Sequence, residues 1–268
     1  MSNSYPNGYT PSLIKIFSKR SVDKQAHFLL PFLNKEYALL DCGCGPGTIT
    51  LGFASTLSLG RVVGVDINGS QIVQARELAV KRKLHNVEFF QGDIAHLEFK
   101  ENSFDVVFTS GVLWSVSDIY VVLKELKRVV KPGGIIACRE PFGDAFIYHP
   151  RVELITKALD LLFRSQSEFG CDNNMGEKLP GYFLQEHLYD IQATFSWDVF
   201  SLRQEVEEWV QVFVESWKYA PWANKVREKG WASEEEIEKY LESFYSWKEQ
   251  LGAQLSMPWY EVIGYVEK

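Results

Sequence analysis

Three glycines alternate with other residues in the stretch DCGCGPGT, which runs from Asp41 to Thr48. An apolar run precedes this stretch and a helical pattern follows it. Glycine adopts positive φ and lets the backbone approach a ligand closely, and the start of the next helix offers free amide groups to an anionic group. The stretch therefore predicts a ligand-binding turn, although a simple strand-to-helix turn would also use glycine.

The spacing of the glycines argues against a dinucleotide ligand. The dinucleotide fingerprint G-x-G-x-x-G would begin at Gly43 and require a third glycine at position 48, which is Thr48. The third glycine is Gly47 instead, and an acidic residue, Asp66, ends the next apolar run.

The elements that must position these residues follow from the hydrophobic pattern. Helical spacing fills the intervals between short apolar runs, and KPGG at 131–134 is expected to stop the helix before it. Such an alternation indicates a parallel sheet covered by helices on both faces, with ligands at the carboxyl ends of its strands. The apolar runs predict strands at 37–41, 61–66, 87–90, 105–109 and 134–139.

Composition limits the classes of function. The 268 residues carry a net charge of −7, so the chain lacks the basic surface that nucleic-acid binding needs. No apolar run approaches the roughly 20 residues of a membrane span, and the first residues do not resemble a signal peptide, so we expect a cytosolic protein. Reduced thiols and no metal site are expected, because metal-ligand spacing is missing around the four cysteines, Cys42, Cys44, Cys138 and Cys171.

Five segments together resemble class I S-adenosylmethionine-dependent methyltransferases. The ends of the chain, RSVDKQAHFLLPFL and PWYEVIGYVEK, are similar to a small-molecule branch of the ubiquinone and menaquinone biosynthesis type. The segments, in chain order, are ALLDCGCGPGTITLGFA, VVGVDINGSQIVQARELA, VEFFQGDIAHLEF, SFDVVFTSGVLWSVSD and LKRVVKPGGIIACRE.

The resemblance implies an α/β, Rossmann-like fold with a seven-stranded, mostly parallel sheet, helices on both faces and a helical lid. Its implied parts are an N-terminal helical cap at 1–34, a cofactor-binding core at 35–150, and a C-terminal part at 151–268. The last two strands are expected near 193–202 and 259–266, with the lid inserted between them at about 203–252.

The resemblance also implies how S-adenosylmethionine is bound and S-adenosylhomocysteine released. The glycine loop would contact the methionine part, with Asp41 near its amino group. Asp66 would accept hydrogen bonds from both ribose hydroxyls, Asp93 would bind the adenine amino group, and Ser110 would line the passage to the substrate. Alternatively, Asp66 caps a helix and Asp93 belongs to a turn. The implied cofactor residues are Asp41, Gly43, Cys44, Gly45, Asp66, Ile67, Asp93, Ile94 and Ser110.

The candidate catalytic residues differ from the family pattern. Where many relatives have histidine in V-L-x-H, this chain has VLWSV with Trp114 and Ser115. A sulfonium cofactor is already activated, so holding the acceptor in line can supply most of the acceleration. Glu140 and then His149 are the candidate general bases. Alternatively, Glu140 is a partner of Arg139 or a helix cap, and His149 is a surface residue.

Aromatic residues suggest the kind of acceptor. Trp209, Phe213 and Trp217 lie four residues apart on one predicted helix, either as the inner surface of a lid or as ordinary core. Ser233 and Glu236 predict a capping box at the next helix. The predicted substrate-pocket residues are Tyr9, Phe28, Trp114 and Glu140.

We therefore expect methyl transfer to a small, apolar or aromatic organic molecule, with no nucleic-acid partner. A protein methyltransferase and a non-catalytic, cofactor-binding regulatory or scaffold protein are the alternatives. The sequence predicts neither the methylated atom nor the oligomeric state.

Overall fold

The computed structural model describes residues 5–267, so residues 1–4 of the predicted N-terminal segment and residue 268 lie outside it. The chain forms two compact units. The sheet unit comprises Phe17–Pro141, Asn174–Ser196 and Trp259–Lys268, and the helical unit comprises Met1–Ile16, Phe142–Asn173 and Trp197–Pro258. Each unit is described by itself.

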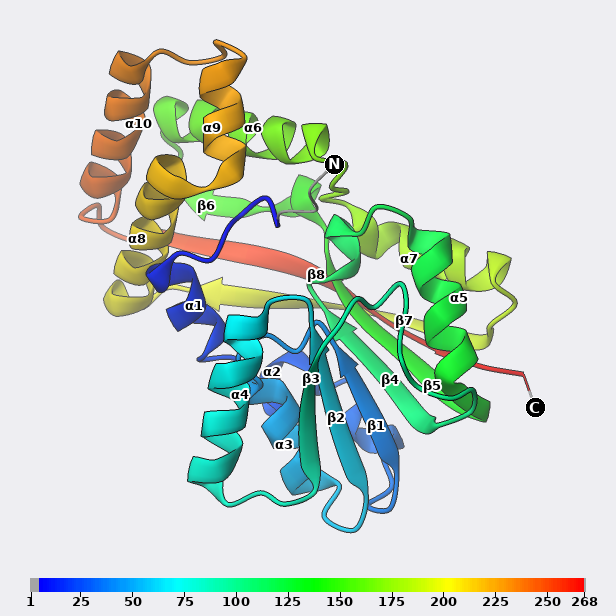
Figure 1. Cartoon of the computed structure of the whole chain (residues 1–268). Helices are drawn as coiled ribbons and strands as arrows, with labels where there is room; N and C mark the ends of the chain where they lie inside the picture. The colour runs from blue at the N-terminus through cyan, green and yellow to red at the C-terminus, as the bar shows by residue number, and fades with distance from the viewer. Residues whose placement is uncertain (1–4, 268) are drawn as a thin grey trace. The chain divides into compact units, whose positions relative to one another are not determined.

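The sheet has eight strands in the order β3-β2-β1-β4-β5-β8-β6, with β7 paired to β8 (Figure 1). Strands β1 to β5 are parallel, and β8 runs antiparallel to β5 and β6. The strands are β1 Ala38–Cys42, β2 Arg61–Asp66, β3 Val87–Gln91, β4 Phe104–Ser110, β5 Val130–Pro141, β6 Ile147–His149, β7 Tyr189–Phe200 and β8 Gln254–Tyr265.

The five predicted parallel strands are confirmed, and two details differ from the sequence prediction. The sheet has an eighth strand, β6, whose three residues are too few to show an alternating pattern. The helix before β5 ends at Val129, and the KPGG motif lies inside β5. Backbone bonds from Gly133 to Val266, and from Val266 back to Gly134, hold this motif in the sheet.

Helices cover both faces of the sheet. On one face, α2 and α3 pack against β1, β4 and β5, where the rings of Phe53 and Phe108 meet edge to face at 5.1 Å. On the other face, α7 packs closely against β8. A Cβ on Gly264 of β8 would lie only 2.7 Å from Phe183 of α7. The helices of the sheet unit are α2 Val22–Gln25, η1 Leu30–Phe32, α3 Thr48–Thr56, α4 Gly69–Arg82, η2 Leu113–Ser115, α5 Ile119–Val129 and α7 Met175–Gln185.

Three helices connect β7 to β8, in the interval where the sequence predicts inserted helices and shows the pattern of two. The predicted aromatic stripe belongs to the core of the helical unit, because Phe213 stacks on Phe244 at 5.0 Å and Trp217 meets Trp222 at 4.8 Å. The capping box of Ser233 and Glu236 is confirmed. Besides η3 Gly143–Ala145 and α1 Pro11–Phe17, which begins in this unit, the helices are α6 Glu153–Glu168, α8 Arg203–Tyr219, α9 Pro221–Glu228 and α10 Glu234–Trp247.

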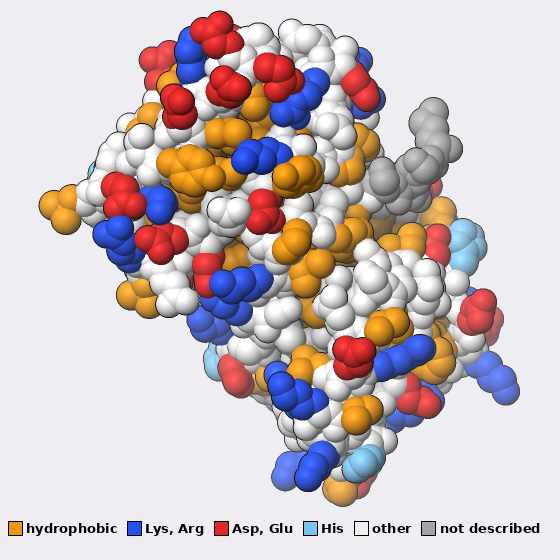
Figure 2. All heavy atoms as spheres, turned by 60° about the vertical axis from the view of Figure 1, so that its left-hand side comes forward, with side chains coloured by type: hydrophobic (Ala, Val, Ile, Leu, Met, Phe, Trp, Pro, Cys, Tyr) orange, Lys and Arg blue, Asp and Glu red, His pale blue; other side chains and the backbone are white. Residues whose placement is uncertain are grey.

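Among residues 5–267, no helix combines the length and apolar character that crossing a membrane requires. On the face shown in Figure 2, acidic and basic side chains lie among one another, with apolar side chains between them. All four cysteines are buried free thiols. This face therefore carries charges of both signs, although the chain as a whole has a net negative charge.

Candidate functional site

The loop between β1 and α3 uses its three glycines for different purposes. Gly43, Gly45 and Gly47 all have positive φ, at +75°, +52° and +79°. A Cβ on Gly43 would lie 2.3 Å from Cγ2 of Val112, and one on Gly47 would lie 2.7 Å from Cβ of Ala75. A Cβ on Gly45 would meet nothing within 4 Å. Packing therefore explains Gly43 and Gly47, whereas Gly45 borders open space.

Backbone hydrogen bonds fix this loop against the end of β2. The amides of Gly43 and Cys44 donate to the carbonyl of Val65 at 2.7 and 3.0 Å. Burial raises the pKa of the Cys44 thiol well above its ordinary value, so this residue contributes its backbone rather than a thiolate. Helix α3 begins after Gly47 without a side-chain cap, which leaves amide groups of its first turn for a ligand.

Asp66 ends β2 beside the loop. Its Oδ2 accepts the Gly45 amide at 2.8 Å and its Oδ1 accepts the Asn68 amide at 2.9 Å. Burial raises the pKa of Asp66, and the two amide hydrogen bonds oppose this shift. A carboxylate has about four acceptor positions, so both oxygens can accept a further donor. The helix cap is Asn68 rather than Asp66, and the next residue, Ile67, exposes 53% of its surface.

Asp41 lies at the other side of the glycine loop, near the end of β1. It is buried, and its Oδ2 accepts the hydroxyl of Thr50 at 2.6 Å. Burial raises the pKa of Asp41 to about 7, while the Thr50 hydrogen bond acts in the opposite direction. A cationic group beside this carboxylate would restore its ionised form.

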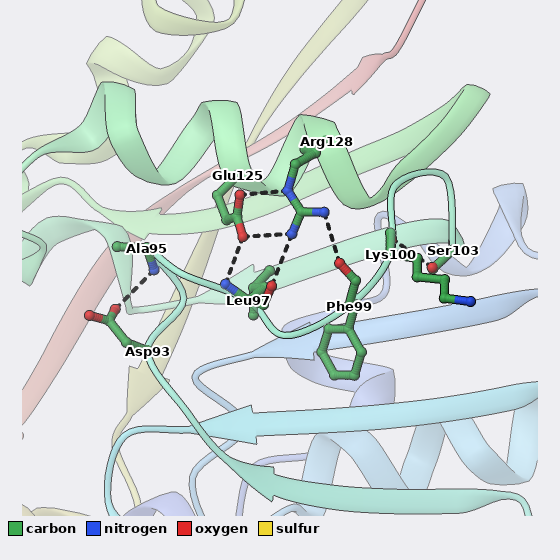
Figure 3. Close-up of polar contacts among 8 residues, drawn as sticks. All are labelled: Asp93, Ala95, Leu97, Phe99, Lys100, Ser103, Glu125 and Arg128. Atoms are coloured by element: carbon green, nitrogen blue, oxygen red, sulfur yellow. Dashed lines mark hydrogen bonds and ion pairs between the residues drawn. The ribbon is translucent and has the colours of Figure 1, made fainter.

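Asp93 and Ile94 follow β3 in a loop that a salt bridge holds in place (Figure 3). Glu125 accepts the Leu97 amide at 2.7 Å, and the Arg128 guanidinium beside it donates to the Leu97 carbonyl at 2.9 Å. Asp93 accepts the Ala95 amide, as the turn alternative expects, but half of its side chain stays exposed. Ile94 is buried.

The end of β4 lies against the glycine loop through Val112. Ser110 is buried, and its hydroxyl has no hydrogen-bond partner among the residues that the structure describes. Trp114 is also buried, and its indole N–H donates to the Gly111 carbonyl at 3.1 Å. A buried hydroxyl without a protein partner is unusual in a folded protein, and this one is free to bond a ligand atom or a water molecule.

Glu140 has a different environment from the predicted one. The resemblance implies that Glu140 faces the substrate, but its fully buried carboxylate accepts the Val112 amide at 3.0 Å and the Trp114 amide at 3.2 Å. Burial raises the pKa of Glu140 to about 7, and the amide hydrogen bonds oppose this shift. Its partner is thus the loop after β4, not Arg139, which lies on the opposite face of β5.

The other predicted pocket and catalytic residues are described within their own units. His149 lies exposed on β6, and Tyr9 contacts Tyr5 at a ring distance of 5.4 Å, both within the helical unit. Phe28 packs against the core of the sheet unit, 6.4 Å from Phe108. The roles of these three residues stay predictions.

Two buried polar residues, Gln71 and Arg139, are not among the site residues predicted from the sequence. Gln71 in the first turn of α4 is buried, and neither of its amide atoms has a partner among residues 5–267. Arg139 exposes only 1% of its surface and forms an ion pair with Glu261 at 3.4 Å. A charged residue inside the apolar run GIIACRE was the available signal for Arg139.

Comparison with known proteins shows the family of the chain. The methyltransferase domain family matches residues 33–193, which is more than half of the chain. The chain therefore belongs to the methyltransferase domain family, and it is an S-adenosylmethionine-dependent methyltransferase.

Individual relatives support the same family. The chain is 29% identical over 262 residues to an uncharacterized methyltransferase of Schizosaccharomyces pombe, covering 91% of this chain and 90% of that one. It is 32% identical over 133 residues to demethylmenaquinone methyltransferase of Lactococcus lactis, covering 49% and 50% of the two chains. The fold is similar to that of the YcgJ protein from Bacillus subtilis, with a TM-score of 0.60, 17% identity, and coverage of 91% and 98%.

The substitution Asp41→Asn is expected to remove a pH dependence of stability. An unfolded aspartate has a pKa of about 3.9, whereas burial raises the pKa of folded Asp41 to about 7. Between these values the folded state holds more protons, so this residue's contribution to stability falls as pH rises towards 7. Asparagine keeps an acceptor for Thr50 and cannot ionise. Denaturation between pH 4 and pH 8 measures the free energy of unfolding of both proteins. The value for the variant, relative to that for wild type, should rise with pH up to about 7. A difference that stays constant over this range would contradict the prediction.

Proposed function

We propose that the chain binds S-adenosylmethionine between the glycine loop and Asp66 and methylates a small organic molecule. The open space beside Gly45, bordered by the Asp66 carboxylate that holds its amide, is the observation that carries this proposal. When bound, the cofactor supplies an electrophilic methyl group on a sulfonium.

The residues of the loop fit the methionine part of this cofactor. Gly45 would let the backbone approach it, and the uncapped start of α3 would offer amides to its carboxylate. Asp41 would bind the ammonium group, and this cation would compensate for the burial that raises the pKa of its carboxyl. Gly43 and Cys44 would hold the loop through their bonds to Val65.

The residues after β2 and β3 fit the adenosine part. Asp66 would accept both ribose hydroxyls at the acceptor positions that Gly45 and Asn68 leave. Ile67 would cover one face of the adenine and Ile94 the other, with Asp93 accepting the adenine amino group. The exposed apolar side chain of Ile67 supports such a contact, because the rest of the protein leaves much of it uncovered.

In this proposal Glu140 acts as a positioning residue, which holds the loop after β4 in place. Its carboxylate binds the Val112 and Trp114 amides, so it shapes the loop that lies against Gly43. Ser110 would line the passage between cofactor and acceptor. Orientation of the acceptor in line with the methyl group supplies the acceleration, without a histidine in the position of Trp114 or Ser115.

A small, apolar or aromatic acceptor is the substrate class that we propose. A relative that matches half of this chain is named for a small molecule, demethylmenaquinone. On the face seen in Figure 2, charges of both signs are mixed, whereas a nucleic-acid partner would call for a basic surface. A cytosolic location follows from the sequence as a prediction only.

Labelled S-adenosylmethionine tests the proposed function. The purified protein is incubated with the methyl-labelled cofactor and an extract of the cells that produce it, and label is counted in organic-soluble, protein and nucleic-acid fractions. We expect label in the organic-soluble fraction, and none with Asp66→Ala. Label only in protein or nucleic acid would contradict the acceptor class, and cofactor binding without label would favour a non-catalytic role.

Asp66→Ala is expected to weaken binding of S-adenosylmethionine by at least about 3 kcal/mol, or roughly a hundredfold, because two charge-assisted hydrogen bonds are lost. Calorimetry measures the affinity, and thermal unfolding checks that the variant folds. Asp23→Ala, in the exposed first turn of α2, is the control and should bind as wild type does. Equal affinities for wild type and Asp66→Ala would remove Asp66 from the site.

A further inference from the structure

Gln71 is a buried glutamine in the first turn of α4, the helix that follows Asp66 and β2. It exposes 1% of its surface, and neither its Oε1 nor its Nε2 has a hydrogen-bond partner in the part of the chain that the structure describes. Folded proteins pair the large majority of their buried polar side-chain atoms, because burying an amide without a hydrogen bond costs free energy. The carboxamide therefore needs a partner other than the protein itself.

The position of Gln71 in α4 explains why its side chain is unpaired. Asn68 is the N-cap of this helix and Gln71 is its N3 residue, where the side chain of glutamate or glutamine commonly accepts the backbone amide of the N-cap. Asp66 takes this amide instead, because its Oδ1 accepts the Asn68 amide at 2.9 Å. The carboxylate at the end of β2 thus displaces Gln71 from its ordinary partner.

Helix α10 shows the ordinary arrangement. Its N3 residue, Glu236, accepts the backbone amide of the N-cap, Ser233, at 2.8 Å. The N3 residue of α8 is also a glutamate, whereas that of α4 is a glutamine. A glutamate at position 71 would bring a second negative charge near Asp66 and, when ionised, could not donate a hydrogen bond. The neutral carboxamide suits a place beside an ionised Asp66 where a donor is needed.

Two observations place Gln71 between Asp66 and the glycine loop. A side chain at N3 can reach the N-cap amide, and in α4 this amide is bound to Asp66. Residues four apart lie on the same face of a helix, and Ala75, four residues after Gln71, packs against Gly47, where a Cβ would lie 2.7 Å away. The open space beside Gly45 is joined to this end of α4 through Asp66, which accepts the Gly45 amide at 2.8 Å.

The ribose of the proposed cofactor offers the hydrogen-bonding groups that Gln71 lacks. Each ribose hydroxyl has one hydrogen to donate and two lone pairs that can accept. Asp66, in the proposed function, accepts the hydrogen of each hydroxyl, but an ionised carboxylate cannot donate to the lone pairs that remain. The Gln71 carboxamide carries two N–H groups and can donate to them. A carboxylate and a carboxamide side by side therefore match a ribose better than either does alone.

We propose that Gln71 is a further cofactor-binding residue, whose carboxamide donates to a ribose hydroxyl oxygen of S-adenosylmethionine while Asp66 accepts the hydrogen of that hydroxyl. This inference rests on the proposed function. The two side chains together distinguish a ribose from a deoxyribose, because loss of the hydroxyl leaves both without that hydrogen bond. The unpaired carboxamide lowers the stability of the protein without cofactor, and binding of the cofactor pairs it.

Two measurements on Gln71→Met test this proposal, because methionine is similar to glutamine in size but apolar. Calorimetry with S-adenosylhomocysteine should show about tenfold weaker binding than for wild type, since one hydrogen bond is lost. Thermal unfolding without cofactor should show a melting temperature at least equal to that of wild type, since methionine removes the buried unpaired amide. A glutamine with a purely structural role would give the opposite pattern, a lower melting temperature with unchanged affinity.

Gln74→Met is the matched control, because Gln74 lies on the same helix with a partly exposed side chain. It should bind S-adenosylhomocysteine as wild type does. Equal affinities of wild type and Gln71→Met, or a melting temperature of Gln71→Met clearly below that of wild type, would overturn the proposal. Failure of wild type to bind S-adenosylhomocysteine would instead contradict the proposed function, so the two failures are distinguishable.

Analogues of the ligand locate the contact on the ribose. The 2′-deoxy and 3′-deoxy analogues of S-adenosylhomocysteine each lack one hydroxyl, and competition against the labelled cofactor measures their affinities. For one of them, wild type and Gln71→Met should bind about equally, because the hydroxyl to which Gln71 donates is absent. A tenfold difference between the two proteins that persists with both analogues would place the contact elsewhere on the cofactor and overturn the proposal.

Discussion

The hydrogen bond from the Gly45 amide to the Asp66 carboxylate, at 2.8 Å, is the contact on which the site depends. It joins the loops after β1 and β2, which meet because these parallel strands are neighbours and end together. The same bond helps Asp66 to remain ionised against the burial that raises its pKa. A ligand that enters beside Gly45 therefore meets a loop and a carboxylate whose positions are already fixed, which lowers the entropic cost of binding.

Two neighbouring residues of β5 have different tasks, because side chains alternate between the two faces of a strand. Arg139 points to the face that carries Ser110 and Trp259, and Glu140 points to the face where the amides of Val112 and Trp114 lie. The first face holds the ion pair of Arg139 with Glu261, and the second shapes the loop after β4. A shift of one residue in the register of β5 would exchange these tasks.

The residues that we propose for the cofactor could be named from the sequence because their signals are local. Glycine spacing and an acid at a strand end each lie within a few residues, and parallel strands bring such ends to one edge of the sheet. The surroundings of Arg139 and Glu140 depend on contacts between distant residues. Arg139 meets Glu261 only through the pairing of β5 with β8, and Glu140 finds its partners in a loop whose path the sequence does not show. Strand β6 likewise depends on its pairing with β8. The position of KPGG inside β5 depends on backbone bonds to Val266, the residue after β8.

Calorimetric titration with S-adenosylmethionine, comparing Gly45→Val with Gly230→Val, tests the central claim most directly. Both glycines have positive φ, +52° and +62°, and a Cβ on either meets nothing within 4 Å, so the two variants carry similar backbone strain. The account predicts that wild type and Gly230→Val bind one cofactor per chain, and that Gly45→Val remains folded but does not bind. Equal binding by all three proteins, or by none, would contradict it.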